Sequence, residues 1–273
     1  MLRERVAAQL TAVRLLEPDP LSDEVLALAH EPDYIRRLAS GDLSRKEVMA
    51  IGFPWSPQMV ERSRRSAGAT VMACRAAMRD GAAVNLAGGT HHAHAGRGEG
   101  FCCFNDVVLA ARVMRHEDRA ARTLIIDLDV HQGNGSASMA REDPTIFTFS
   151  MHGADNYPFV KEVSDLDIEL ANGTGDDEYL ERLDGALKQI AQRFDPHLLI
   201  YLAGADPFHD DRLGRLALTK QGLLARDQQV FAYARQRGLP VAVAMGGGYG
   251  RQIQDTVDVH FQTVHCALQH ASG

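Results

Sequence analysis

The sequence has few cysteines and no long apolar run, and each shortage argues against a class of protein. Its 273 residues include four cysteines, Cys74, Cys102, Cys103 and Cys266, and none forms a Cys-x-x-Cys pair. Adjacent cysteines rarely bridge, so we expect four reduced thiols rather than a disulfide framework. No run of roughly 18 or more apolar residues appears, and the first residues are charged rather than signal-like. We therefore expect a cytoplasmic protein without a membrane partner.

An excess of basic residues is lacking as well. The chain carries 29 lysines and arginines against 36 aspartates and glutamates, a net charge of −7. This balance provides no overall basic surface, so we expect no direct binding of nucleic acid. The length allows one large domain or two small ones, and α/β domains of this size are often single. Since no repeat or low-complexity linker divides the chain, we predict a single domain over 1–273.

Apolar strand-like segments alternate with amphipathic helix-like segments along the chain. Strands are predicted over 83–87, 122–129, 145–151, 197–203 and 240–245. Helices are predicted over 2–16, 22–29, 32–39, 43–50, 57–79, 105–117, 135–141, 176–193, 219–237 and 251–270. This alternation predicts an α/β fold with a mostly parallel β-sheet and helices on both faces.

The most informative stretch is Leu-Ile-Ile-Asp-Leu-Asp-Val-His at 124–131. Asp127, Asp129 and His131 stand at alternate positions, so on a strand they point to one side. Burying this charge is costly unless a cation compensates it, and carboxylate and imidazole are ligands of divalent metals. The alternative is a buried strand that ends in polar turn residues. Three such side chains together favour a metal or hydrolytic site.

Polar side chains also follow three other predicted strands. His91 and His92 come after 83–87, Asp206 after 197–203, and Tyr249 after 240–245. Ligands of open α/β sheets bind beyond the carboxyl ends of the strands, so these side chains should meet at one edge. Each motif alone has a structural alternative, such as a solvated loop, a helix start or a plain turn. Their convergence is stronger evidence than any single motif.

The residue types at this edge suit hydrolysis. Two adjacent imidazoles can serve as a base and an acid near neutral pH. Asp206 as a third metal ligand would leave a coordination position for water and substrate. Tyr249, on a run of glycines, could donate a hydrogen bond to a developing oxyanion. Asp127 and Asn134 are available as hydrogen-bond acceptors for histidines. We expect His94 to be an exposed loop residue.

Six motifs carry a resemblance to a known family. They are Gly-Gly-Thr-His-His at 88–92, Gly-Phe-Cys-x-Phe-Asn-Asp at 100–106, Asp-Leu-Asp-Val-His-Gln-Gly-Asn-Gly at 127–135, Ser-Met-His at 150–152, Gly-Ala-Asp-Pro at 204–207 and Gly-Gly-Gly-Tyr at 246–249. In this order and spacing they resemble the zinc-dependent histone deacetylases, which have the arginase-deacetylase fold. The tail after His131 and the segment 210–214 most resemble the class IV branch and its bacterial relatives.

The resemblance implies a role for each matching residue. Zinc ligands would be Asp129, His131 and Asp206, and a structural potassium ion would contact Asp127, Ser150 and the main chain of Met151. His91 and His92 would be the general acid/base pair, with Asp127 bonded to His91 and Asn134 supporting His92. Because other branches often have aspartate at the Asn134 position, we expect a lower pKa for His92 here. Tyr249 would polarise the scissile carbonyl. The substrate tunnel would involve Gly100, Phe101, Tyr157, Leu213 and Gly247.

The implied activity is hydrolysis of the amide bond of an N-acyl-lysine or a related acylated amine. Acetylpolyamine deacetylation, from the same superfamily, is an alternative, although the long loop insertion of those relatives is not seen here. A catalytically silent module that binds acylated peptides is another, and the intact His91, His92 and Tyr249 argue against it. Relatives generally begin with an extra strand, whereas this sequence starts in a predicted helix, so we expect the tunnel rim to differ.

Overall fold

The computed structural model describes residues 1–272, and its centre is a six-stranded β-sheet in which neighbouring strands all run parallel. The strands lie in the order β1-β6-β5-β2-β3-β4. They are β1 (Ala82–Asn85), β2 (Thr123–Asp127), β3 (Ile146–Gly153), β4 (Leu166–Leu170), β5 (Leu198–Gly204) and β6 (Val241–Gly246). The predicted α/β fold is confirmed, and the sheet is wholly rather than mostly parallel.

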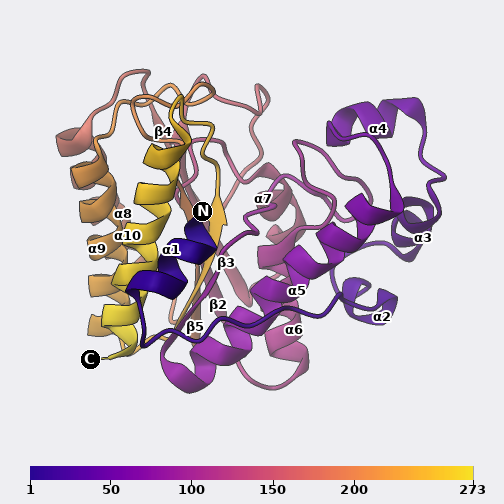
Figure 1. Cartoon of the computed structure of the whole chain (residues 1–273), viewed down its shortest axis with the longest axis horizontal. Helices are drawn as coiled ribbons and strands as arrows, with labels where there is room; N and C mark the ends of the chain where they lie inside the picture. The colour runs from indigo at the N-terminus through magenta and orange to yellow at the C-terminus, as the bar shows by residue number, and fades with distance from the viewer. Residues whose placement is uncertain (273) are drawn as a thin grey trace.

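Helices cover both faces of the sheet (Figure 1). One face packs against α8, α9 and α10, and the other against α5, α6 and α7. The short helices α2 to α4 lie beyond α5, at the far side of the molecule from α8 and α9 (Figure 1). The helices are α1 (Leu2–Gln9), α2 (Asp23–Leu26), α3 (Pro32–Ser40), α4 (Arg45–Ile51), α5 (Pro57–Asp80), α6 (Asp106–His116), α7 (Asn134–Ala140), α8 (Asp176–Arg193), α9 (Lys220–Gln236) and α10 (Ile253–Ala271).

The central strands are buried on both faces because helices cover each side. In β2, Leu124 and Ile126 pack toward α8 and α9, whereas Ile125 packs toward α5 and α6. Such strands read as continuous apolar runs rather than as an alternation. This explains why Leu-Ile-Ile stands immediately before the polar residues of the site.

The strand order creates a switch point between β2 and β5. From β2 the chain moves outward through β3 to β4, and from β5 it moves the other way to β6. The connecting helices α7 and α9 lie on opposite faces of the sheet. In open α/β folds, ligands bind in the crevice at the carboxyl ends of strands on either side of such a point. The segments that follow β2 and β5 therefore flank the expected site.

Two predictions of local structure were wrong. The helix predicted over 2–16 ends at Gln9, and its apolar residues Leu10 and Val13 pack against the fold from a non-helical segment. The strand β4 was missed because its sequence alternates apolar residues with acidic ones at the edge of the sheet. Among residues 1–272, none of the helices combines the length and the apolar character needed to cross a membrane.

Candidate active site

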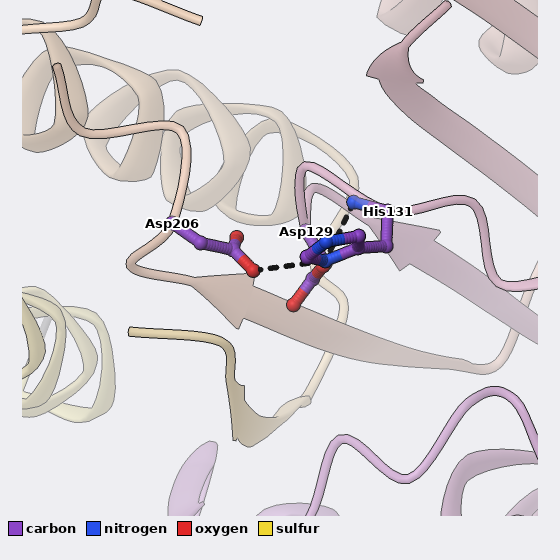
Figure 2. A group of neighbouring side chains, drawn as sticks. All are labelled: Asp129, His131 and Asp206. Atoms are coloured by element: carbon purple, nitrogen blue, oxygen red, sulfur yellow. Dashed lines mark hydrogen bonds and ion pairs between the residues drawn. The ribbon is translucent and has the colours of Figure 1, made fainter. Parts of the chain in front are cut away.

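Asp129, His131 and Asp206 converge beyond the ends of β2 and β5. One ligand atom from each lies within 4.8 Å of the other two. The Nδ1 atom of His131 is 2.9 Å from Oδ1 of Asp129 and 3.2 Å from Oδ2 of Asp206 (Figure 2). Both aspartates are buried and the histidine is half-buried. Residues on either side of the switch point thus form one compact triad.

The two carboxylates of the triad carry more negative charge than its single imidazole can balance. A single imidazole Nδ1 lies between two carboxylates, and it can donate one proton to only one of them. Among the described residues, Oδ2 of Asp206 is buried and has no hydrogen-bond partner. Burial and the neighbouring Asp129 raise the pKa of Asp206 to about 7. Burial alone would lower the pKa of His131, but Asp129 and Asp206 raise it to about 11.

Two buried carboxylates that share one imidazole need a cation or extra protons to be stable in this place. Two carboxylate oxygens and an imidazole nitrogen are a donor set that divalent metals accept, with coordination positions left over. The residues present therefore fit a divalent metal ion.

A glycine leaves the space that Asp206 occupies. Gly247 follows β6 with a φ of +60°, a conformation that favours glycine. A Cβ atom at this position would lie 2.2 Å from Cγ and Oδ2 of Asp206. Gly247 therefore acts by lacking a side chain, which is how the Gly-Gly-Gly motif contributes to the triad.

His91 and His92 lie beside the triad, each held by its Nδ1 atom. Nδ1 of His91 is 2.7 Å from Oδ2 of Asp127, and Nδ1 of His92 is 2.7 Å from Oδ1 of Asn134. The two imidazole rings have centroids 4.1 Å apart. Nε2 of His91 is 4.0 Å from Oδ1 of Asp129. The structure brings together the histidines and the acceptors that the family resemblance pairs with them.

The two histidines have opposite pKa shifts. Burial lowers the pKa of His91, but Asp127 and Asp129 outweigh it and raise the value to about 9. Burial and the neighbouring His91 hold the pKa of His92 well below its usual value. The Asn134 hydrogen bond acts in the other direction and raises the pKa of His92, but burial and His91 outweigh it. Neighbouring groups with pKa values pushed apart suit an acid and a base.

The loop that carries the two histidines is anchored by residues that the sequence did not single out for this purpose. Nδ1 of His30 lies 3.1 Å from the His94 carbonyl, while Nε2 of His30 accepts a hydrogen bond from the Asn105 amide at 3.0 Å. The side-chain amide of Asn105 donates to the His91 and Ala93 carbonyls, and its oxygen caps α6. The neighbouring Asp106 accepts hydrogen bonds from residues 89 and 90.

The prediction that His94 is exposed was wrong, since its side chain is buried. Residues 94 and 97 pair across a tight turn, and the Arg97 guanidinium donates to Nε2 of His94 at 2.9 Å. This turn folds the imidazole inward. Loop composition alone carries no sign of it.

Beneath the triad lies a buried ion pair that joins the two strand ends. The guanidinium of Arg226 pairs with Asp227 at 2.8 Å, and both side chains are fully buried. Arg226 also donates to the Gly204 carbonyl at 2.6 Å and to the Leu128 carbonyl at 3.4 Å. These two carbonyls lie on opposite sides of the switch point. Gly204 comes two residues before Asp206, and Leu128 comes one residue before Asp129. The ion pair therefore supports the backbone that presents both aspartates.

A cavity of about 820 Å³ leads from the surface to the triad and both histidines. Its wall contains Tyr249 and the tunnel residues implied by the family resemblance, namely Gly100, Phe101, Tyr157, Leu213 and Gly247. The Tyr157 ring stands edge-on to His92 with centroids 4.9 Å apart, and Phe101 lies across the opening from Tyr249 at 6.4 Å. Gly100 has a φ of +57°, and a Cβ there would meet the His92 ring at 2.6 Å.

The residues expected at a potassium site lie behind the triad. Asp127 and Ser150 are neighbours in register on β2 and β3, and Met151 follows. Both carboxylate oxygens of Asp127 already have a partner. Oδ2 contacts Nδ1 of His91, and Oδ1 accepts a hydrogen bond from the Asp129 backbone amide. The structure therefore brings the three residues together.

Comparisons with known proteins agree on one family. The family model for the histone deacetylase domain matches residues 1–264. A protein of Picosynechococcus sp. is 45% identical over 86% of this chain and 78% of its own length. Histone deacetylase 2 of Arabidopsis thaliana is 34% identical over 89% of this chain and 66% of its own length.

A solved structure supports the same fold. The acetylpolyamine aminohydrolase of Burkholderia pseudomallei superposes with a TM-score of 0.77 at 23% identity, over 97% of this chain and 88% of that one. At 23% identity, this structural similarity supports the fold and not a shared activity. Taken with the family match over nearly the whole sequence, these findings show that the chain belongs to the histone deacetylase family and is a hydrolytic enzyme.

Proposed function

We propose that this enzyme hydrolyses the amide bond of an N-acyl-lysine or a related acylated amine, with one zinc ion held by Asp129, His131 and Asp206. The observation that carries the proposal is the charge-deficient triad at the base of the cavity, next to two histidines with opposite pKa shifts. A divalent cation at such a site supplies Lewis acidity to the carbonyl and lowers the pKa of water.

In the proposed reaction the two histidines divide the proton transfers. Asn134 accepts from Nδ1–H of His92, which leaves the lone pair of Nε2 free to take a proton from the attacking water. His91, kept protonated by Asp127, is suited to give a proton to the departing nitrogen as the carbon–nitrogen bond breaks. The products are a carboxylate and a free amine.

Tyr249 and the tunnel residues position the substrate in this proposal. The Tyr249 hydroxyl would donate a hydrogen bond to the oxygen that becomes negatively charged during attack. Phe101 and Tyr157 would flank the extended aliphatic part of an acyl-lysine. Gly100 and Gly247 provide the close approach that side chains would prevent, and Leu213 would contact the substrate at the rim.

The charges at the cavity mouth favour lysine over polyamine substrates. Within the described residues, the charged side chains that line the cavity apart from the metal triad and the histidines are Arg62, Arg215 and Asp155. A polyamine keeps further positive charges after acylation, and these would meet two arginines against one aspartate. Positive charges of the substrate and of the arginines in one cavity would repel each other. An acyl-lysine side chain carries no such charge.

We also propose that potassium binds to Asp127, Ser150 and the Met151 carbonyl, as the family resemblance implies. The carboxylate and hydroxyl from neighbouring strands are hard oxygen ligands of the kind alkali cations accept. Replacing potassium by tetramethylammonium in the assay buffer should then lower activity.

The test of the main proposal is a hydrolysis panel with acyl-lysine peptides and acetylpolyamines, run on zinc-loaded and chelator-treated enzyme. We expect release of carboxylate from acyl-lysine peptides, loss of turnover on metal removal, and recovery when zinc is returned. Full activity after complete metal removal would contradict the metal-dependent mechanism. Faster turnover of acetylpolyamines than of any acyl-lysine would instead reverse the substrate assignment.

A further inference from the structure

The amide of Asn134 bridges His92 and a carboxylate outside the motifs that carry the family resemblance. Its Oδ1 lies 2.7 Å from Nδ1 of His92, and its Nδ2 donates to Oε1 of Glu99 at 2.7 Å. Glu99 comes from the loop before Phe101, 35 residues away in sequence. The result is a continuous hydrogen-bonded path from the imidazole through the amide to the carboxylate.

Glu99 determines which way the Asn134 amide can point. An ionised carboxylate accepts hydrogen bonds and donates none. If the amide were reversed, its oxygen would face Oε1 of Glu99 at hydrogen-bonding distance with no proton between them, and two acceptors repel. Glu99 therefore holds Nδ2 on its own side and Oδ1 toward His92, and Nε2 of His94, 3.4 Å from Nδ2, is a second and more distant acceptor on that side. With Oδ1 as the neighbour, Nδ1 of a neutral His92 must carry the proton.

Glu99 is itself held in place. The Tyr157 hydroxyl donates to the same Oε1 atom at 2.8 Å, and Nε of Arg97 lies 3.3 Å from Oε2. Its side chain is only 16% exposed. Although burial acts to raise the pKa of Glu99, hydrogen bonds from His94, Asn134 and Tyr157 lower it overall. The carboxylate is thus ionised and fixed, as an acceptor-only anchor must be.

We propose that Glu99 is a positioning residue that locks the Asn134 amide and thereby keeps neutral His92 as the Nδ1–H tautomer, with the Nε2 lone pair directed into the cavity. The catalytic consequence rests on the proposed function, in which this lone pair takes the proton from water. The tautomer itself does not depend on that function. An asparagine at this position can orient the histidine as an aspartate does, provided that a carboxylate stands behind it.

The first test measures the tautomer directly. In protein labelled with ¹⁵N-histidine, two-bond ¹H–¹⁵N correlation spectra distinguish the protonated from the unprotonated ring nitrogen, and a His92→Gln variant assigns the signal. We expect Nδ1–H in the wild type and a mixture of tautomers in Glu99→Gln, whose amide can present either an oxygen or an NH₂ group to Asn134. An unchanged Nδ1–H signal in Glu99→Gln would overturn the inference, whether or not the enzyme is active.

The second test is kinetic rescue. Glu99→Gln should lower kcat about 10-fold with KM nearly unchanged, a typical loss for an outer hydrogen-bond partner of an active-site histidine. Asn134→Asp alone should lose at least as much, because two carboxylates then face each other at the 2.7 Å contact. The double variant Glu99→Gln/Asn134→Asp should recover to within about 3-fold of the wild type, since the new carboxylate accepts from His92 directly.

Two control variants separate this role from general stabilisation. Glu117→Gln neutralises a comparably shielded carboxylate, 24% exposed and paired with Arg75, far from the cavity. Tyr157→Phe removes one donor to Glu99 but leaves the Asn134 contact in place. Both should keep the Nδ1–H tautomer of His92. Failure of the double variant to regain activity, with its fold intact, would overturn the catalytic part of the inference.

Discussion

Replacing Gly247 by alanine tests whether the space beside Asp206 matters for metal binding. The new Cβ would lie 2.2 Å from the Asp206 carboxylate. Ordinary contact begins near 3.4 Å, so one of the two must move by about 3.4 − 2.2 = 1.2 Å. Metal–ligand distances tolerate about 0.2 Å. Disturbing the groups that orient a metal ligand typically lowers metal affinity by about 10- to 100-fold, and here a ligand itself is displaced, so we expect zinc affinity to fall by about 100-fold.

The affinity is measured by competition between the metal-free protein and a chelating dye. Gly238→Ala is the matched control, because Gly238 also has a positive φ of +63° but its added Cβ would meet no atom of the described residues within 4 Å. It shares the backbone strain, about 1–2 kcal/mol, without the clash. We expect it to be less stable and to bind zinc normally. Equal zinc affinity in Gly247→Ala and the wild type would refute the account of the triad.

Two further outcomes follow from the same geometry. Tyr249→Phe should lower kcat by about 100- to 1000-fold, the usual loss of an oxyanion donor, while zinc content by elemental analysis stays at the wild-type level; unchanged turnover would remove Tyr249 from the mechanism. Burial lowers the pKa of His30 from 6.5 to about 4, so between these values the unfolded chain binds a proton that the folded protein does not, and stability falls as pH falls. Urea unfolding should show that the wild type loses about 2 kcal/mol more than His30→Gln between about pH 7.5 and about pH 5; parallel losses would mean that His30 is protonated in the native state.

The convergence of the metal ligands could be predicted from local order, whereas the pairing of Asn134 with His92 and the tunnel residues came from the family resemblance. Leu-Ile-Ile before Asp127 identifies a buried strand, and the rule that parallel strands end at one edge brings Asp129 and Asp206 together. Both steps need only neighbours in the chain and a general property of α/β folds. The structure confirms the fold and places these side chains as expected.

What the sequence did not reveal depends on contacts between distant segments. Glu99 reaches Asn134 across 35 residues, and His30 reaches the Asn105 amide across 75. Nothing near Glu99 or His30 in the chain indicates a partner. The edge strand β4 was hidden for a different reason, since its solvent-facing acidic residues break the apolar run by which the central strands are recognised.

The proposed reaction depends on one ion bound by the triad. The most direct measurement is an anomalous difference map, recorded at the zinc absorption edge, from crystals of the enzyme purified with zinc. The account predicts a single strong peak in contact with Asp129, His131 and Asp206. A zinc-bearing crystal with no peak between these three side chains, or with its only peak elsewhere, would contradict it.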